Sequence, residues 1–253
     1  MKLRTLLTAA AAAMMLTAAP ASAQQLSIAT GGTGGTYYPY GGGLAELITK
    51  YVDGSSAVAE VTGASVENMG LISRGDSDIA IGLADTVYAG FTGTGKFEGR
   101  TLDNVRALAS IYPNAVQIVT MADSGINGLA DLKGKRVSVG APGSGTEVSA
   151  QTADALRDGD IDAGFWSVGP PTSSILNLAT TRDIKLIALT DDEILAALDA
   201  EPTFAPYALR TGIYEGVTAP VNTISTPNVL FVNEEMDEEL AYQITKTLFE
   251  KVE

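Results

Sequence analysis

The sequence lacks cysteine and histidine altogether, and it contains a single tryptophan in 253 residues. Without cysteine no disulfide can form, so apolar packing must hold the fold together even in an oxidising compartment. The lack of both residue types excludes Ser-His-Asp triads, cysteine nucleophiles and the usual zinc ligand sets. We therefore expect a protein that is not an enzyme and that uses neither a metal nor a cofactor.

Positive charge is the second scarce feature. The chain has 16 Lys and Arg residues against 30 Asp and Glu residues, which gives a formal net charge of −14. This balance repels a phosphate backbone, so the sequence argues against a nucleic-acid partner. Acidity is also the usual state of a solvated protein surface, and by itself it identifies no partner.

The first 23 residues have the three parts of an export signal. Lys2 and Arg4 precede an apolar run at residues 6–19, and the small residues Ala21-Ser22-Ala23 follow it. The apolar run is short for a membrane span. We predict cleavage after residue 23, which leaves 230 of the 253 residues, a formal charge of −16 and a periplasmic protein that begins at Gln24.

Short apolar runs alternate with helical patterns along the rest of the chain, and this alternation predicts an α/β fold. The expected strands are residues 26–30, 57–62, 79–83, 116–121, 136–140, 161–166, 184–189 and 228–232. The expected helices are residues 42–52, 65–74, 85–89, 146–157, 172–180, 192–199 and 237–252. Residues 202–226 contain prolines and glycines without clear periodicity, so we expect them to be mainly loop.

Two glycine-rich loops, at residues 31–35 and 140–145, each follow an apolar run and precede a helical pattern. Glycine lets backbone amides approach a ligand closely, and amides at a helix start attract negative charge. Tyr37 and Tyr38, directly after the first loop, add flat apolar faces with a hydroxyl at the tip. Two such loops indicate one ligand held between two halves, although ordinary strand-to-helix turns would leave the same pattern.

The turn-rich segment after Met121 predicts a domain boundary, and the chain can return to its first half near Thr226. We expect lobe I at residues 24–121, lobe II at 122–222, and a return to lobe I at 223–253. Two crossings between the lobes would form a hinge. The sequence thus predicts a two-lobe periplasmic-binding-protein fold with a ligand cleft between the lobes.

Three other patterns have weaker functional interpretations. Residues 90–97 resemble a phosphate-binding P-loop, but Phe97 stands where a Ser or Thr would contact magnesium. The first glycine loop lacks the third glycine of a dinucleotide-binding motif. Acidic pairs at residues 76/78 and 160/162 stand where turns lead into strands, so solvated turn residues are the stronger interpretation.

An ordered set of motifs resembles the TAXI-type solute-binding proteins, the exported receptors of one class of TRAP transporters. The motifs run through nearly the whole predicted mature chain: Gly-Gly-Thr-Gly-Gly-Thr-Tyr-Tyr-Pro39, Glu60-Val-Thr-Gly-Ala-Ser-Val-Glu-Asn68, Leu83-Ala-Asp-Thr-Val-Tyr88, residues 131–147, Ile161-Asp-Ala-Gly-Phe-Trp166 and Gly169-Pro-Pro171. This resemblance implies two lobes that close on a small organic anion such as glutamate or 2-oxoglutarate. It also implies docking on a membrane permease that uses an ion gradient, and we expect the receptor to be a monomer.

The resemblance also implies a set of ligand-binding residues from both lobes. They are Gly34, Gly35, Thr36, Tyr37, Asn68 and Asp85 in the first lobe, and Gly143, Ser144, Gly145, Thr146, Trp166 and Pro170 in the second. Hydroxyls and amides can hold a carboxylate, and Tyr37 can cover a carbon chain. Asp85 suits a ligand ammonium, and capping of the following helix is an equal alternative.

The chain departs from the resembled pattern in two places. After Ala150 there is room for one helix, where the family runs a helix, a strand and another helix before Ile161. The family also continues beyond the position of Glu253. We expect these omissions to affect stability and cleft geometry, mainly in the second lobe. A ligand-sensing module for a signalling partner is the alternative function, and an anion-processing enzyme is the third.

Overall fold

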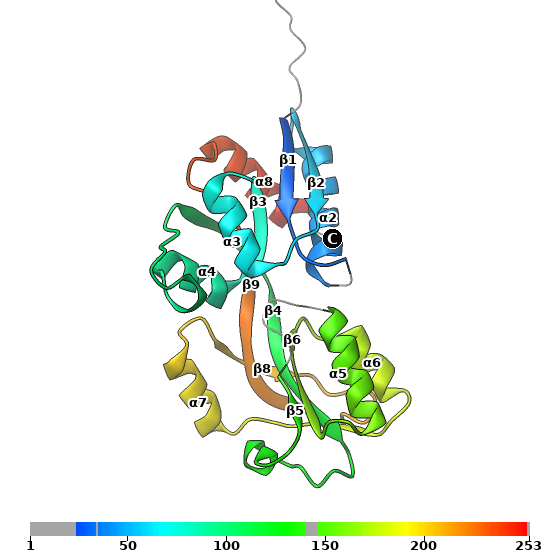
Figure 1. The fold of residues 1–253 in the computed structure, drawn as a ribbon. Helices are drawn as coiled ribbons and strands as arrows, with labels where there is room; N and C mark the ends of the chain where they lie inside the picture. Colours follow the sequence, from blue (N-terminus) through cyan, green and yellow to red (C-terminus); the bar gives the residue numbers. More distant parts are fainter. Residues whose placement is uncertain (1–23, 34, 140–145, 252–253) are drawn as a thin grey trace, which may run out of the picture.

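The computed structural model describes residues 24–33, 35–139 and 146–251, and of residues 146–150 it describes only the backbone. The chain forms an upper and a lower lobe joined along one sheet (Figure 1). In the described part, nine strands form this sheet in the order β2-β1-β3-β9-β4-β6-β5, with β7 paired to β4 and β8 paired to β9. The strands are β1 Gln24–Ala29, β2 Ser55–Glu60, β3 Ile79–Leu83, β4 Val105–Met121, β5 Val137–Ser138, β6 Ala163–Val168, β7 Ile184–Leu186, β8 Ala205–Leu209 and β9 Val221–Asn233.

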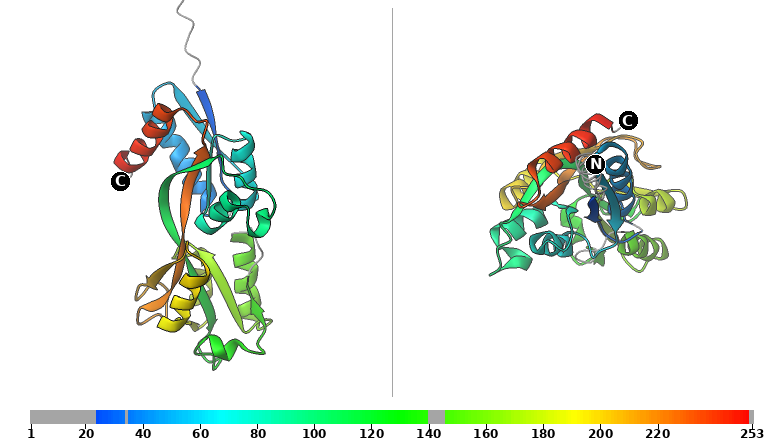
Figure 2. Two further views of the ribbon diagram at one scale, coloured as in Figure 1. Left: turned by 90° about the vertical axis from the view of Figure 1, so that its left-hand side faces the viewer. Right: turned by 90° about the horizontal axis from the view of Figure 1, so that it is seen from above.

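Helices cover both lobes, as the two further views in Figure 2 show. The upper lobe, lobe I, carries α2, α3, α4 and α8, and the lower lobe, lobe II, carries α5, α6 and α7. Their bounds are α2 Tyr37–Tyr51, α3 Ser65–Arg74, α4 Ala84–Thr92, α5 Thr146–Asp158, α6 Ser173–Ala179, α7 Asp191–Ala200 and α8 Glu238–Lys251. Two short 3-10 turns, η1 Gly95–Phe97 and η2 Leu129–Leu132, complete the elements.

Alternation along β1 explains the core of lobe I. Leu26 and Ile28 pack with Leu44 of α2 and Ile244 of α8. Ala29 belongs to a separate cluster with Met69 and other side chains from α3 and its neighbours. Successive strand residues point to opposite faces, so one strand supplies both helical layers.

The close contact between α2 and β1 requires a glycine in the helix. A Cβ atom at Gly41 would lie 2.4 Å from the Thr30 Cγ2 atom and 3.6 Å from the Ala59 Cβ atom. No side chain fits at that distance, so the helix passes over the sheet through its glycine face. The expected start of this helix at residue 42 is therefore wrong, because Gly41, Gly42 and Gly43 are helical and α2 begins at Tyr37.

Two long strands connect the lobes. The first half of β4 pairs with the second half of β9 in lobe I, while its second half pairs with β6 and β7 in lobe II. Where both strands pass from one lobe to the other, Pro113 lies opposite Pro227. Neither proline is paired with a residue of β3, β6 or β8. The sheet is therefore two strands wide at this waist, and proline has no N–H to donate to the ladder.

Most of the expected elements are confirmed, and two regions are wrong besides the start of α2. Residues 202–226 contain β8 and the first part of β9, so they are not mainly loop. The strand expected at 116–121 is the end of β4, which begins eleven residues earlier at Val105. Both errors involve strands that bury polar side chains such as Thr223 and Asn114, which breaks the apolar alternation expected of a strand.

Candidate functional site

The border between the lobes collects the starts of several helices. The parallel strands β1 and β2 end there, and α2, α3 and α4 begin on the same side of lobe I (Figure 1). Amide groups at a helix start are free to bind an acceptor and carry partial positive charge. In open α/β sheets the carboxyl ends of parallel strands are the usual ligand-binding edge.

Tyr37, one of the predicted binding residues, stands at the first position of α2 and reaches across to β9. Its hydroxyl donates a hydrogen bond of 2.6 Å to Asn228 Oδ1 and lies 3.4 Å from Ser65 Oγ. Burial raises the pKa of the Tyr37 hydroxyl well above its ordinary value, and the Asp85 carboxylate adds to this shift. Tyr37 is therefore a neutral hydrogen-bonding group at physiological pH.

Asn68 lies beneath this border and its amide is fully used inside the protein. Its Nδ2 group donates to the carbonyl oxygens of Thr30 at 2.7 Å, Ile81 at 2.8 Å and Ala29 at 3.3 Å. Its Oδ1 atom accepts from Thr62 Oγ1 at 2.6 Å. The geometry gives Asn68 a role in positioning the ends of β1 and β3 beneath the border.

The turn that leads into α3 holds a strained backbone. Ala64 has φ 67° and ψ −153°, a region that L-residues other than glycine avoid. Its N–H donates to Thr62 Oγ1 at 3.1 Å, and its carbonyl accepts from the Asn68 N–H at 2.9 Å. The neighbouring hydrogen bonds therefore hold this turn in place against the strain.

Asp85 lies in the first turn of α4, where both the amide and the hydroxyl of Thr86 donate to its Oδ1 atom. Burial raises the pKa of this carboxyl, and the charge of Glu201, which follows α7 in lobe II, raises it further. Asp85 thus satisfies an amide of its own helix, and its pKa also responds to the charge of an acidic residue of the other lobe.

The second-lobe predictions divide into three groups. Gly143, Ser144 and Gly145 lie outside the described residues, as does Gly34 of the first loop, and of Thr146 only the backbone is described. Trp166 is 2% exposed and packs in the core of lobe II, where its Nε1 group donates to Ser174 Oγ at 3.1 Å. Pro170 follows β6 at the border, next to Gly169.

Thr36 and Gly35 stand immediately before α2. The Thr36 side chain is exposed, and no side-chain hydrogen bond caps the helix at this residue. Gly35 donates its N–H to the Gly32 carbonyl at 2.9 Å, which tightens the loop. The structure thus brings Gly35, Thr36, Tyr37 and Asp85 to the same border, places Asn68 directly beneath it, and places Trp166 in the core.

The structure reveals a set of border residues that the sequence patterns did not select. Tyr112-Pro113-Asn114 in β4 and Thr226-Pro227-Asn228 in β9 have the same order, a hydroxyl residue, a proline and an asparagine. The antiparallel register sets Tyr112 opposite Asn228 and Asn114 opposite Thr226. The repeated triplet is visible in the sequence. However, proline is rare inside strands, so these segments were not predicted to be strands.

The two asparagines of these triplets are satisfied by the protein itself. Asn228 Nδ2 donates to Asn114 Oδ1 at 2.8 Å and to the Tyr112 carbonyl at 3.0 Å. Asn114 Nδ2 donates to the Ser167 carbonyl at 3.3 Å, in lobe II. With the bond from Tyr37 to Asn228, a continuous polar chain runs from α2 in lobe I to β6 in lobe II.

A second polar chain continues into lobe II. The Tyr214 hydroxyl donates to Gln117 Oε1 and accepts from the Thr172 N–H at 3.1 Å, just before α6. Gln117 Nε2 donates to the Val168 carbonyl at 3.4 Å. Burial raises the pKa of Tyr214 to about 12. The loop between β6 and α6 is therefore attached to β4 through these side chains.

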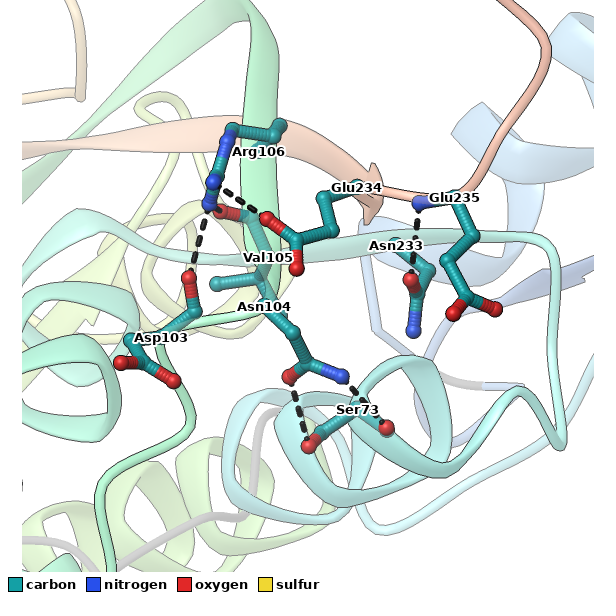
Figure 3. Close-up of polar contacts among 8 residues, drawn as sticks. All are labelled: Ser73, Asp103, Asn104, Val105, Arg106, Asn233, Glu234 and Glu235. Atoms are coloured by element: carbon teal, nitrogen blue, oxygen red, sulfur yellow. Dashed lines mark hydrogen bonds and ion pairs between the residues drawn. The ribbon is translucent and has the colours of Figure 1, made fainter.

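A surface hollow of about 380 Å³ lies at the opposite, outer end of lobe I and is lined by Gln24, Ser73, Asn104, Asn233 and their neighbours. Figure 3 shows that its polar groups bond to one another: Asn104 Nδ2 donates to the Ser73 carbonyl at 2.8 Å, and the Glu235 N–H donates to Asn233 Oδ1 at 3.0 Å. Asn233 Nδ2 also donates to the Ile72 carbonyl at 2.9 Å. These contacts fasten β4 and β9 to α3.

Comparison with known protein families shows to which family the chain belongs. The model of the NMT1-like family matches residues 28–152 and 148–253. The chain belongs to the NMT1-like family. The two matched segments meet at residues 148–152, the position at which the sequence predicts an omitted segment.

Solved structures show the same architecture for this NMT1-like protein. A TctC solute-binding protein from Polaromonas is 15% identical, with a TM-score of 0.55, over 89% of this chain and 83% of that one. The aliphatic sulphonate binding protein SsuA from Escherichia coli is 13% identical, with a TM-score of 0.55, over 89% and 70%. The probable amino-acid ABC transporter extracellular-binding protein ytmK from Bacillus subtilis is 15% identical, with a TM-score of 0.51, over 90% and 91%. The expected two-lobe α/β fold is thus confirmed.

Proposed function

We propose that this protein is a periplasmic solute receptor that captures a small carboxylate between its lobes and delivers it to a TRAP-type permease. The observation that carries the proposal is the polar crossing, where Tyr37, Asn228 and Asn114 connect two lobes of a solute-binding fold. Among the residues that the structure describes, no helix has the length and apolarity that crossing a membrane requires.

Closure of the lobes is supported by the waist of the sheet. Pro113 and Pro227 oppose each other where β4 and β9 pair only with one another. A two-strand ribbon that lacks proline N–H groups bends more easily than a wide sheet with a full set of ladder bonds. We propose that the lobes move about this proline pair, which sets the division between lobes nearer to residues 113 and 227 than to 121 and 222.

The carboxylate assignment is supported by the chemistry of the border. The start of α2 offers amide groups beside Thr36 and Tyr37, and the border holds several neutral hydroxyls. In this proposal Gly143, Ser144, Gly145 and Thr146 contribute ligand contacts from lobe II, with Pro170 on the wall. In the same proposal Asp85 accepts a ligand ammonium.

The TAXI assignment and the TRAP partner are supported by the ordered motifs and by the family match. The match in two segments agrees with a chain that omits a helix, a strand and a helix after Ala150. Export is supported by the leader pattern of residues 1–23. Intact mass of the periplasmic fraction should correspond to residues 24–253, and a retained leader would contradict this.

A thermal-shift screen tests the receptor role. At a ligand concentration of 100 times Kd, binding stabilises a folded protein by about 2.7 kcal/mol. We expect at least one of a panel of small carboxylates, with L-glutamate and 2-oxoglutarate included, to raise the melting temperature, while neutral sugars leave it unchanged. Stabilisation by sugars alone would reject a carboxylate ligand, and a deletion of a neighbouring permease gene that leaves uptake intact would reject the transport role.

A further inference from the structure

We propose that the Tyr112 and Thr226 hydroxyls contact the ligand directly and that they form a carboxylate site without a cation, which selects small monocarboxylates over dicarboxylates. This inference rests on the proposed receptor function and names the chemistry of that same border. It is carried by three observations: the mirrored triplets, the unpartnered hydroxyls and the distribution of Lys and Arg.

The first observation is the geometry of the triplets. Directly opposite residues of an antiparallel pair point to the same face, and so do residues two apart in one strand. Tyr112, Asn114, Thr226 and Asn228 therefore share one face at the waist, and the hydrogen bond between the two asparagines agrees with this. Diagonal neighbours such as Tyr112 and Thr226 have Cα atoms about 7–8 Å apart, a separation that a small ligand can bridge.

The second observation is how the hydrogen bonds of this face are used. The two asparagine side chains bond to each other, to Tyr37 and to backbone carbonyls. In contrast, Tyr112 Oη and Thr226 Oγ1 are buried, and neither makes a hydrogen bond with the described part of the chain. The Thr36 hydroxyl is near enough to act on Tyr112 Oη but lies outside hydrogen-bonding geometry. A buried hydroxyl without a partner costs free energy, and a ligand oxygen would remove that cost.

The surroundings of Tyr112 place its hydroxyl between the lobes. Its ring centroid is 5.5 Å from that of Tyr40 on α2, and a Cβ atom at Gly169 of lobe II would lie only 3.3 Å from the ring. Burial raises the pKa of Tyr112 well above its ordinary value, and Tyr37 and Tyr40 raise it further, while the Thr36 hydroxyl lowers it. Tyr112 is thus a neutral group next to the start of α2.

The third observation is the absence of Lys and Arg from the sequence of every segment named at the border. Residues 30–33, 35–37, 61–65, 83–88, 112–117, 166–173 and 225–228 contain neither. Two acidic side chains act at the described part of the border: in addition to burial, the charge of Glu201 raises the pKa of Asp85, and the charge of Asp85 raises the pKa of Tyr37. Neutral hydroxyls and amides can hold one carboxylate, whereas a second carboxylate would meet Asp85 and Glu201 without a compensating cation.

Isosteric variants of the purified full chain test the two hydroxyls. Tyr112→Phe and Thr226→Val remove only an unpartnered hydroxyl, so we expect each to leave the unliganded melting temperature unchanged or higher and to raise Kd at least tenfold. The matched controls remove partnered hydroxyls: Tyr214→Phe, and Thr223→Val, whose hydroxyl donates to the Val116 carbonyl at 2.7 Å. Each control should lower the unliganded melting temperature and change Kd less than twofold.

The probes are two matched pairs, L-glutamine with L-glutamate and 2-oxopentanoate with 2-oxoglutarate, at equal concentration and measured by thermal shift and calorimetry. We expect the monocarboxylate of a pair to bind at least tenfold more tightly, with little dependence on salt because no Lys or Arg is involved. Tighter binding of the dicarboxylates, or an unchanged Kd in both Tyr112→Phe and Thr226→Val, would overturn the proposal.

The two proposals fail in distinguishable ways. If no carboxylate binds the wild-type chain, the receptor function for carboxylates is contradicted. In that case the unliganded variants still decide on the hydroxyls: a Tyr112→Phe variant destabilised as much as Tyr214→Phe would show that the Tyr112 hydroxyl has a structural partner, and the inference would be wrong.

Discussion

The outer hollow of lobe I and the crossing between the lobes are both polar, but they differ in whether their hydrogen bonds are complete. In the hollow, Asn104 bonds to the backbone of α3 at Ser73 (Figure 3), and Asn233 bonds to the backbone of α3 at Ile72. At the crossing the asparagines are also occupied, while the hydroxyls of Tyr112 and Thr226 are not. Buried polar atoms without a hydrogen-bond partner are therefore a stronger sign of a ligand site than a concave polar surface whose groups are all bonded.

The largest expected effect on the free energy of unfolding comes from replacing one asparagine in each region, Asn228 at the crossing and Asn233 at the hollow. Asn228 is fully buried and makes three hydrogen bonds, whereas Asn233 is half-buried and makes two. We expect Asn228→Leu to lower the free energy of unfolding by about 3–4 kcal/mol, because it leaves several buried partners unsatisfied. Asn233→Leu should cost about 1 kcal/mol, as measured by urea unfolding. Equal losses would remove the distinction between the regions.

The next largest effect is the pH dependence of stability that the buried Tyr214 hydroxyl causes. Burial raises the pKa of Tyr214 to about 12, from an ordinary value of 10, so its folded form holds the proton more tightly than the unfolded chain. The resulting stability is present below pH 10 and is lost as the pH rises from 10 to 12, by up to about 2.7 kcal/mol. We expect urea midpoints to fall in this window, and to fall less in Tyr214→Phe. A flat profile in the wild-type chain would contradict the buried position.

A smaller gain is expected from relieving strain at the border. Ala64 has the one positive φ of a non-glycine residue in the described part of the chain. Glycine adopts this conformation without a Cβ penalty, so we expect Ala64→Gly to stabilise the protein by about 1 kcal/mol. Ala130→Gly, at a position without positive φ, is the control and should be neutral or destabilising. Destabilisation by Ala64→Gly would show that the turn is not strained.

The smallest effect is expected at an exposed ion pair whose residues adjoin in sequence those that line the outer hollow. The Arg106 guanidinium bonds to Glu234 and to the Asp103 carbonyl, and the side chains of the ion pair are 52% and 45% exposed. Exposed ion pairs contribute about 0–1 kcal/mol because water and salt screen them. Arg106→Gln should therefore change the free energy of unfolding by less than about 1 kcal/mol and leave ligand affinity unchanged. A large loss of affinity would direct attention to the hollow.

The sequence predicted lobe I better than lobe II for a physical reason. Lobe I strands such as β1 have apolar residues that alternate between two helical layers, which periodicity detects. In β9 buried Thr and Ser side chains interrupt that pattern; Thr223, for example, is 1% exposed and bonds to the Val116 carbonyl. Local patterns do not reveal such partners, because they come from strands that are far away in sequence.

The candidate site could be predicted only in part. The glycine loop before α2 and the adjacent Tyr37 carry a local signature, so the sequence alone could propose them as site residues. Tyr112 and Thr226 were missed because their importance depends on the register that sets β4 against β9, more than 100 residues apart in sequence. The prediction of Trp166 as a wall residue relied on the resemblance, and in the structure the ring is surrounded by core side chains.

Hydrogen–deuterium exchange of the purified chain, with and without a carboxylate identified in the thermal-shift screen, tests most directly whether the ligand binds at the crossing. We predict that the ligand slows exchange in peptides covering residues 35–45, 110–118 and 222–230, because closure about the proline pair buries these segments. Peptides covering residues 100–106 and 233–240, at the outer hollow, should exchange at the same rate in both samples. Protection confined to the hollow, with no change at the crossing, would contradict the account.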